Sequence, residues 1–246
     1  MSGLWAAWRF LTIIPLPGKT GTDSTSLARS LPFFPILGLL IGLLMSYCAF
    51  LAWHFLPQPC AAVALTFALL AISGGFHLDG LADSADGLFS ARPKDRMLAI
   101  MRDSHIGVMG VISLLMIVLL KVTALNVMTP ERAMLAAFLM PLAGRTLMVL
   151  SMALVPYIRK HGAASLFYAS PSKLRKTALW AGFLLYAGAW YSGQGTALAA
   201  AAAALVVTLL WTGYCRIKIG GATGDTLGAC CELAETAVAL ALVIKL

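Results

Sequence analysis

Long apolar runs alternate with short polar stretches along the whole chain. A helix that crosses a bilayer needs roughly 20 predominantly apolar residues, within a range of about 17 to 25. Seven runs approach or reach that length: 32–56, 60–76, 106–128, 131–155, 177–192, 196–214 and 226–246. The pattern therefore predicts an all-α, polytopic integral membrane helix bundle with about seven transmembrane helices, and six or eight are compatible with the same pattern.

Composition supports a membrane protein and argues against other classes. The chain is 60% hydrophobic and only 11% charged, whereas a soluble domain has about 25% charged residues. A net charge of +8 would suit nucleic-acid binding, but basic and aromatic residues are not interleaved, so no nucleic-acid partner is expected. Residues 1–246 are expected to form one membrane-embedded domain. Its first 30 residues are expected to lie at the membrane interface, with a partly inserted or packed segment as the equal alternative.

The distribution of Lys and Arg predicts the orientation of the helices. If the N-terminus is cytoplasmic, 14 of the 18 basic residues fall on the cytoplasmic side, as expected from the excess of Lys and Arg in cytoplasmic loops. The other four lie in predicted spans or near their far ends: Lys121, Arg132, Arg145 and Lys245. This orientation places segment 77–107 and the loops 156–176 and 215–225 together at the cytoplasmic face.

Segment 77–107 concentrates the negative charge of the chain. It contains five of the ten acidic residues: Asp79, Asp83, Asp86, Asp95 and Asp103. The first three are spaced i, i+4, i+7, which puts their carboxylates on one face of a helix. Like charges near a membrane are costly unless a cation receives them. The spacing predicts a Mg²⁺ site with hard oxygen ligands; the alternative is a solvated amphipathic helix between two spans.

Several polar residues around these carboxylates are candidates for contacts with an anionic substrate. Arg96 and Arg102 suit phosphate groups, because Arg binds phosphate through two parallel hydrogen bonds. Arg159, in the loop 156–176, and His77, just before the acidic face, are further substrate-binding candidates. Asp103 is a candidate general base or further ligand, with a polar helix cap as the alternative.

A second polar cluster lies near the C-terminus. Gly221 and Gly224 precede Asp225, and their backbone N–H groups could cradle a phosphate at a helix N-terminus. Asp225 and Glu232 are seven residues apart and share one helix face, and carboxylates in the first turns of a membrane span are rarely without a function. The alternative is an N-cap formed by Thr223 or Asp225, with hydrogen bonding inside the bundle.

Two basic residues fall inside predicted spans. An unpaired charge there is expensive, so Arg145 is expected to face the bundle interior and to meet a carboxylate or a substrate phosphate. Lys121 is expected to extend its side chain toward an interface.

The motifs resemble those of one enzyme family. HLDGLADSADGLF followed by MRDSHIG, then GGATGD–GA–CE and the opening FLTIIPLP, are similar to the cobalamin 5′-phosphate synthase family of adenosylcobinamide-GDP ribazoletransferases. The resemblance covers nearly the whole chain. It implies transfer of GDP-activated adenosylcobinamide phosphate to α-ribazole or its 5′-phosphate with release of GMP, using Mg²⁺, in the bacterial inner membrane with the active site facing the cytoplasm. A homo-oligomer or an assembly with other corrinoid-pathway enzymes is compatible with it.

This resemblance gives each candidate residue a role. The expected metal ligands are Asp79, Asp83, Asp86, Asp225 and Glu232. The expected catalytic residues are Asp103, Asp86 and Arg102. The expected substrate-binding residues are His77, Arg96, Arg145, Arg159, Gly221 and Gly224.

Two other functions remain open at this point. The clustered carboxylates also resemble those of the CDP-alcohol phosphotransferases, although Asp83 stands where their Asp-Gly-x-x-Ala-Arg pattern has Ala. A cation or corrinoid transporter would explain the intramembrane charges and the Gly-broken spans. Against transport, the carboxylates gather at one membrane face and not near the midplane.

Overall fold

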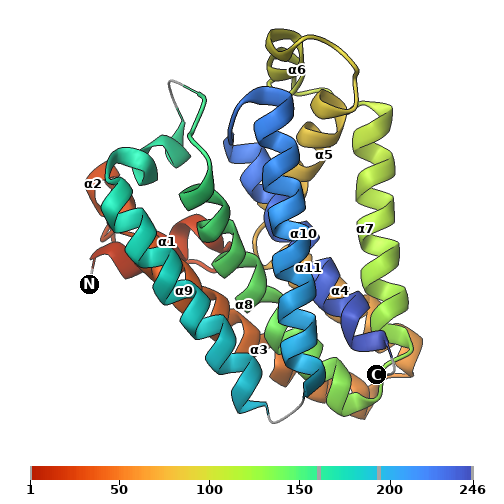
Figure 1. Ribbon diagram of the computed structural model, residues 1–246. Helices are drawn as coiled ribbons and strands as arrows, with labels where there is room; N and C mark the ends of the chain where they lie inside the picture. The colour runs from red at the N-terminus through yellow and green to blue at the C-terminus, as the bar shows by residue number, and fades with distance from the viewer. Residues whose placement is uncertain (1, 160–161, 193–194, 245–246) are drawn as a thin grey trace.

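The computed structural model describes residues 2–159, 162–192 and 195–244, and the basic residues Lys160 and Lys245 lie outside this set. The regular elements in these ranges are helices, joined by loops and turns (Figure 1). The α-helices are α1 (Ser2–Leu11), α2 (Ser24–Ala28), α3 (Phe34–Phe55), α4 (Gln58–Ala71), α5 (Phe76–Leu88), α6 (Lys94–Ile100), α7 (Val108–Asn126), α8 (Pro130–Leu154), α9 (Pro171–Tyr191), α10 (Gly195–Ile219) and α11 (Gly224–Val243). Two 3₁₀-helices, η1 (Leu31–Phe33) and η2 (Ala163–Ala169), precede α3 and α9.

The predicted all-α membrane bundle is confirmed, but the count of seven spans is not. Among the described residues, 5 helices are long and apolar enough to cross a membrane, or 6 if α4 and α5 form one broken span. Helix α9 coincides with the predicted span 177–192 but is not among them. Its first two turns carry Lys173, Arg175 and Lys176, which shorten its apolar part.

Helices α8 and α11 form the interior of the bundle. In its most apolar window, 83% of α8 is buried, against 28% for α7 and for α10 on the outside. Figure 1 shows α8 running through the middle, with α3 and α9 on one side and α10 on the other. On α7, Val111, Leu115 and Leu119 remain exposed. Such outward apolar faces suit contact with lipid chains.

Two glycines four residues apart join α3 to α8. A side chain at Gly38 would collide with the carbonyl oxygen of Pro141, and one at Gly42 with the carbonyl oxygen of Phe138. Small residues at this spacing let the backbones of membrane helices approach closely. This contact anchors the first long helix to the interior of the bundle.

The chain breaks between α4 and α5, contrary to the prediction of one span over 60–76. Gly74 and Gly75 adopt φ values of 63° and 73°, a left-handed conformation that costs glycine little. The two helices are bent by 85° at this point. Helix α4 has 14 residues, or about 21 Å of length, which is too short to cross the hydrocarbon core of about 30 Å alone.

The break changes the environment of the acidic segment. Helix α5 packs against α7 and α11, and most of its residues are buried. The alternative of a solvated amphipathic helix is therefore wrong for residues 76–88.

The N-terminal segment packs onto the bundle, and its expected position at the membrane interface stays a prediction. Ala7 and Leu11 of α1 are buried in one apolar cluster with Leu31 and Phe34. Arg9 donates hydrogen bonds to backbone carbonyls of the following loop, among them that of Gly18 at 2.7 Å. These contacts fold the loop back over α1.

Candidate active site

Helices α5 and α11 cross at two glycines. A side chain at Gly80 would collide with the backbone of Asp225, and a Cβ at Gly228 would lie 3.3 Å from the His77 backbone. The close approach puts the carboxylates of Asp79 and Asp83 within electrostatic reach of Asp225. Residues of the two acidic clusters that the sequence analysis identified therefore meet at this crossing.

The N-terminus of α11 is fixed by Thr223. Its side chain accepts a hydrogen bond from the Thr226 N–H at 3.2 Å, and the Thr226 hydroxyl accepts one from the Thr223 N–H at 2.9 Å. This reciprocal pair satisfies N–H groups that a helix start leaves without partners. Of the two N-caps expected from the sequence, Thr223 is the one observed, which leaves the Asp225 carboxylate available for other contacts.

The loop before α11 is tied to the chain that follows α8. Ile158 N–H donates to the Ala222 carbonyl at 3.1 Å, and Ala222 N–H donates to the Pro156 carbonyl at 2.9 Å. A side chain at Gly221 would collide with that Pro156 carbonyl. Gly221 therefore allows a close backbone contact. Gly224 has open space around it and lines a cavity.

This contact places Arg159 beside Asp225. The Arg159 Nη2 donates to the Asp225 Oδ2 at 2.6 Å. The Arg159 Nε is buried and has no hydrogen-bond partner among the described residues. Arg159 thus neutralises one carboxylate and keeps a donor for a ligand.

The carboxylates at the crossing fit a divalent cation by their chemistry. Within residues 2–159, 162–192 and 195–244, the side chains of Asp79 and Asp83 have no cationic partner in an ion pair. Hard oxygen donors without counter-charges suit Mg²⁺, which would relieve their repulsion. In the same ranges, no three Asp, Glu, His or Cys side chains are already close enough to ligate one ion. The donor type fits the metal, while the ligand geometry is not preformed.

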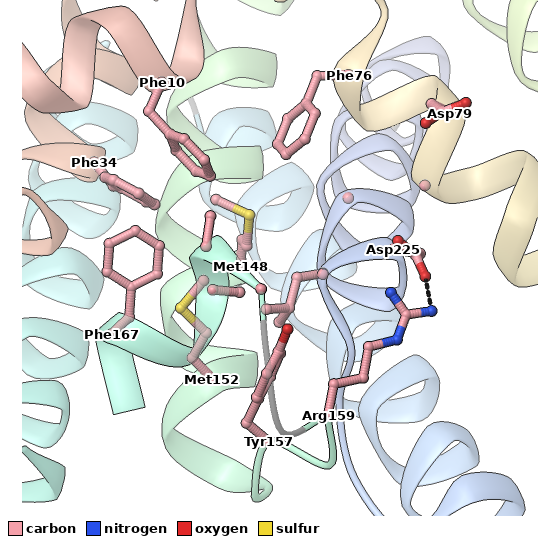
Figure 2. Close-up of a pocket in the computed structure, with 17 residues that line it drawn as sticks. Phe10, Phe34, Phe76, Asp79, Met148, Met152, Tyr157, Arg159, Phe167 and Asp225 are labelled. Atoms are coloured by element: carbon pink, nitrogen blue, oxygen red, sulfur yellow. Dashed lines mark hydrogen bonds and ion pairs between the residues drawn. The ribbon is translucent and has the colours of Figure 1, made fainter. Parts of the chain in front are cut away.

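A cavity of about 210 Å³ opens beside these carboxylates (Figure 2). Its polar edge carries Asp79, Tyr157, Arg159 and Asp225. The remaining wall is mostly apolar and is dominated by phenylalanine and methionine: Phe10, Phe34, Phe76, Phe167, Met148 and Met152. Figure 2 shows the rings of Phe10, Phe34 and Phe167 gathered on the left and the Arg159–Asp225 pair on the right, with Phe76 at the top between them. One ligand could therefore contact an apolar surface and charged groups at the same time.

Asp86 has a different environment from the other two Asp residues of α5. Its carboxylate accepts hydrogen bonds from the N–H of Gly107 at 2.7 Å and of Gly110 at 2.8 Å. These donors lie at the start of α7, where backbone N–H groups lack helical partners. Each oxygen of Asp86 thus accepts one hydrogen bond from the start of α7. The metal and catalytic roles expected for Asp86 stay predictions.

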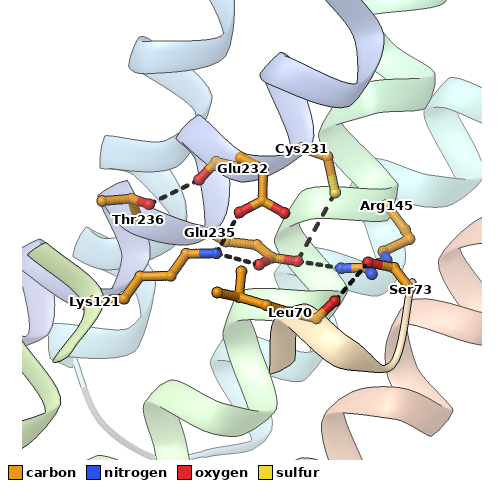
Figure 3. Close-up of polar contacts among 8 residues, drawn as sticks. All are labelled: Leu70, Ser73, Lys121, Arg145, Cys231, Glu232, Glu235 and Thr236. Atoms are coloured by element: carbon orange, nitrogen blue, oxygen red, sulfur yellow. Dashed lines mark hydrogen bonds and ion pairs between the residues drawn. The ribbon is translucent and has the colours of Figure 1, made fainter. Parts of the chain in front are cut away.

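Glu232 belongs to a buried ion cluster (Figure 3), and its charged neighbours are Lys121, Glu235 and Arg145. Lys121 Nζ lies 2.7 Å from the Glu232 Oε2 and 2.7 Å from the Glu235 Oε2. Arg145 pairs with the other oxygen of Glu235. All four side chains are buried, so their two positive and two negative charges offset one another.

The cluster shows what surrounds three residues that the sequence analysis singled out: Arg145, Lys121 and Glu232. Arg145 meets a carboxylate, one of its two expected partners. Lys121 is 0% exposed and does not extend toward an interface, so that expectation was wrong. The metal role expected for Glu232 would require its carboxylate to leave Lys121.

His77, Arg96 and Arg102 do not line the cavity, but Arg102 lies within electrostatic reach of Tyr157 at its polar edge. His77 is 1% exposed and its ring nitrogens have no hydrogen-bond partner in the described ranges. It lies within electrostatic reach of Arg145, Lys121 and Glu235, and thus beside the ion cluster. Arg96 and Arg102 are exposed on α6 and the turn after it.

Asp103 lies in the exposed turn between α6 and α7. The His105 Nδ1 lies 2.6 Å from the Asp103 Oδ1, which also accepts a hydrogen bond from the His105 backbone. These hydrogen bonds hold the pKa of Asp103 below its usual value. Asp103 is therefore ionised at neutral pH, the form that a general base requires.

The phenylalanines and Tyr157 were not singled out from the sequence. Phe10, Phe34, Phe76 and Phe167 belong to α1, α3, α5 and η2, and no spacing along the chain connects them. Only the packing of the four segments brings the rings together.

Comparison with known proteins identifies the family. A sequence profile described as cobalamin-5-phosphate synthase matches residues 3–243. The chain belongs to the cobalamin-5-phosphate synthase family. The match extends over the crossing, the cavity and the buried ion cluster, so all three are features of the family-matched region.

Relatives with curated names agree with this family. A protein of Desulfitobacterium hafniense is 36% identical over 239 residues, covering 96% of this chain and 94% of its own length. One of Citrobacter koseri is 36% identical and covers 97% of this chain and 98% of its own length. One of Geotalea daltonii is 34% identical, with coverages of 97% and 96%. Each is named adenosylcobinamide-GDP ribazoletransferase. No solved structure matches the chain.

Proposed function

We propose that the chain is an adenosylcobinamide-GDP ribazoletransferase that acts at the crossing of α5 and α11. Family membership over residues 3–243 is the observation that carries this proposal. The cavity supports it, because charged groups for a diphosphate adjoin an apolar surface for a second substrate.

The reaction joins two substrates through one phosphorus atom. A ribose hydroxyl of α-ribazole, or of its 5′-phosphate, attacks the phosphorus that is linked to adenosylcobinamide. The bond from that phosphorus to the bridging oxygen breaks, GMP leaves, and the hydroxyl proton is released. Because a 5′-phosphate survives in the product, it is not the attacking group.

The residues at the crossing have complementary roles. Asp79, Asp83 and Asp225 would hold Mg²⁺, which neutralises charge on a diphosphate during phosphoryl transfer. Arg159, with its unpartnered Nε, donates to a phosphate oxygen. Arg96 and Arg102 attract the anionic substrates from the exposed rim, and ionised Asp103 accepts the hydroxyl proton.

The proposal includes an orientation in the bacterial inner membrane. Helix α6, the start of α9 and the end of α10 lie toward the same end of the bundle in Figure 1. Their basic residues include Lys94, Lys173 and Lys218. The positive-inside rule assigns this end, and the candidate site with it, to the cytoplasm.

A reconstituted assay tests the function. Purified protein in liposomes is incubated with adenosylcobinamide-GDP, α-ribazole 5′-phosphate and Mg²⁺, and GMP and the completed corrinoid are quantified. The proposal expects equal amounts of both products, formed only when both substrates are present. Turnover of CDP-alcohol substrates without GMP release would favour a lipid-head-group transferase, and substrate uptake without turnover would favour a transporter.

A further inference from the structure

The apolar end of the cavity is not explained by phosphate or metal chemistry. The Phe10 ring lies 5.4 Å from Phe76, 5.9 Å from Phe34 and 5.8 Å from Phe167, measured between ring centroids. Phe34 and Phe167 are a further 5.2 Å pair. Three of these four contacts are edge-on, an arrangement that aromatic rings favour. The rings therefore form one continuous aromatic wall.

Phe76 is the ring of the aromatic wall through which a ligand can reach the cavity. Phe34 is fully buried and Phe167 is 4% exposed, whereas Phe76 is 47% exposed. Phe76 is the first residue of α5, and Asp79 follows it by less than one turn. A ligand that stacks on Phe76 would thus extend toward Asp79 and the Arg159–Asp225 pair.

The chemistry of the wall selects among aromatic ligands. Guanine carries an exocyclic amine, a carbonyl and ring N–H groups, which would remain unpaired against phenylalanine and methionine. A polar group that is buried without a hydrogen-bond partner lowers the affinity, because its hydration is lost and not replaced. Dimethylbenzimidazole, the base of α-ribazole, has no exocyclic polar group, and its methyl groups suit an apolar wall. The cavity thus favours the base of the second substrate over the guanine of the first.

We propose that this cavity is the base-binding subsite for α-ribazole: the dimethylbenzimidazole packs against Phe10, Phe76 and Phe167, and the ribose faces Asp79 and Arg159. The inference rests on the proposed function, because it names the part of that site that recognises the second substrate. It predicts selectivity for benzimidazole-type bases over purines.

Substitution of Phe76 tests the subsite. Phe76 is half-exposed, so Phe76→Ala removes ring contacts without opening the core. Phe89→Ala is the matched control, because Phe89 lies just after the other end of α5 and is 50% exposed. Loss of stacking on one base is worth about 1–3 kcal/mol. Phe76→Ala should therefore weaken α-ribazole binding about tenfold, and Phe89→Ala should leave it unchanged.

Two readouts separate this inference from the proposed function. Equilibrium dialysis of radiolabelled α-ribazole, with adenosine as comparator, measures binding without turnover. GMP release measures the KM of each substrate in turnover. The inference expects weaker α-ribazole binding and a higher KM for the ribazole substrate, with the KM for adenosylcobinamide-GDP unchanged.

Other outcomes overturn one claim or the other. If Phe76→Ala binds α-ribazole as tightly as the wild type, or raises only the KM for adenosylcobinamide-GDP, the subsite assignment is wrong. If the wild type binds α-ribazole through Phe76 but releases no GMP, the subsite stands and the proposed transferase activity fails.

A filling variant gives an independent check. Gly224 lines the cavity and has open space around it, so Gly224→Leu would place a side chain in the cavity and reduce the volume left for α-ribazole. Gly213→Leu is the matched control, because Gly213 also has open space and lies on α10. Weaker α-ribazole binding in Gly224→Leu alone is expected, and equal binding in both variants would contradict the subsite.

Discussion

At the scale of single residues, six of the ten acidic side chains separate into groups with different tasks. Asp79, Asp83 and Asp225 gather at the crossing, Asp86 caps α7, and Glu232 and Glu235 offset buried cations. The sequence shows these residues as two clusters of carboxylates. It does not show which of them are already occupied, because their partners Gly107, Lys121 and Arg145 come from other helices.

The lowered pKa of Asp103 gives a prediction about pH. Because its pKa lies below the usual value for an Asp side chain, Asp103 stays ionised throughout the range from about pH 5 to 9. Asp103→Asn should therefore lower kcat by the same factor at every pH in that range, about 100-fold if Asp103 is the base. The pH profile of GMP release for the two proteins measures this. A factor that changes with pH would contradict the assignment.

The buried ion cluster predicts a stability effect. Lys121→Met would leave the carboxylates of Glu232 and Glu235 without their shared cation, and breaking a buried pair costs about 3–5 kcal/mol. The variant should unfold at a clearly lower temperature in detergent, while the double variant Lys121→Met/Glu232→Gln should recover part of the loss. Lys173→Met, which removes an exposed cation from the first turn of α9, is the control. Equal melting temperatures for all of them would show that the cluster does not stabilise the fold.

At the scale of helices, hydrophobic pattern alone predicted most of the membrane elements. It placed α3, α7, α8, α10 and α11 to within a few residues, because their apolar runs are long. It missed the break between α4 and α5. In the sequence, Gly74 and Gly75 are small residues within an apolar run, and the pattern does not show that they adopt a left-handed conformation. The same break turns α5 back into the bundle and brings its carboxylates to α11.

The contact of α3 with α8 depends on Gly42. Gly42→Leu would force the two helices apart, because the new side chain would meet the Phe138 backbone. We expect a lower melting temperature and a lower yield of monodisperse protein in detergent. Gly213→Leu, at a position with open space, should behave like the wild type. Loss of stability in both variants would indicate a general effect of Leu and not a specific helix contact.

At the scale of the whole molecule, the bundle collects charge at one end and an aromatic cavity beside it. The family match over residues 3–243 fixes the kind of enzyme. The cavity was not predictable from the sequence, because its wall is assembled from four segments that are distant in the chain. The orientation remains a prediction from the positions of Lys and Arg.

Cysteine labelling tests that orientation. Cys60, at the start of α4, is the exposed cysteine of the chain, and Cys215, Cys230 and Cys231 are buried. A membrane-impermeant maleimide should label Cys60 in cells with a permeabilised outer membrane, because the predicted orientation places it on the periplasmic side. A Ser104→Cys variant that also carries Cys60→Ser should be labelled only after the inner membrane is disrupted. The reverse labelling pattern would place the candidate site on the periplasmic side of the membrane.

The central claim is that transfer takes place where α5 crosses α11, and one comparison tests it most directly. Mg²⁺-dependent GMP release is measured for Asp79→Asn and for Asp95→Asn, which removes an exposed carboxylate from α6. The account predicts at least a 100-fold loss of kcat for Asp79→Asn, with normal membrane insertion, and little change for Asp95→Asn. Unchanged turnover in well-folded Asp79→Asn would contradict the account and place the chemistry elsewhere in the protein.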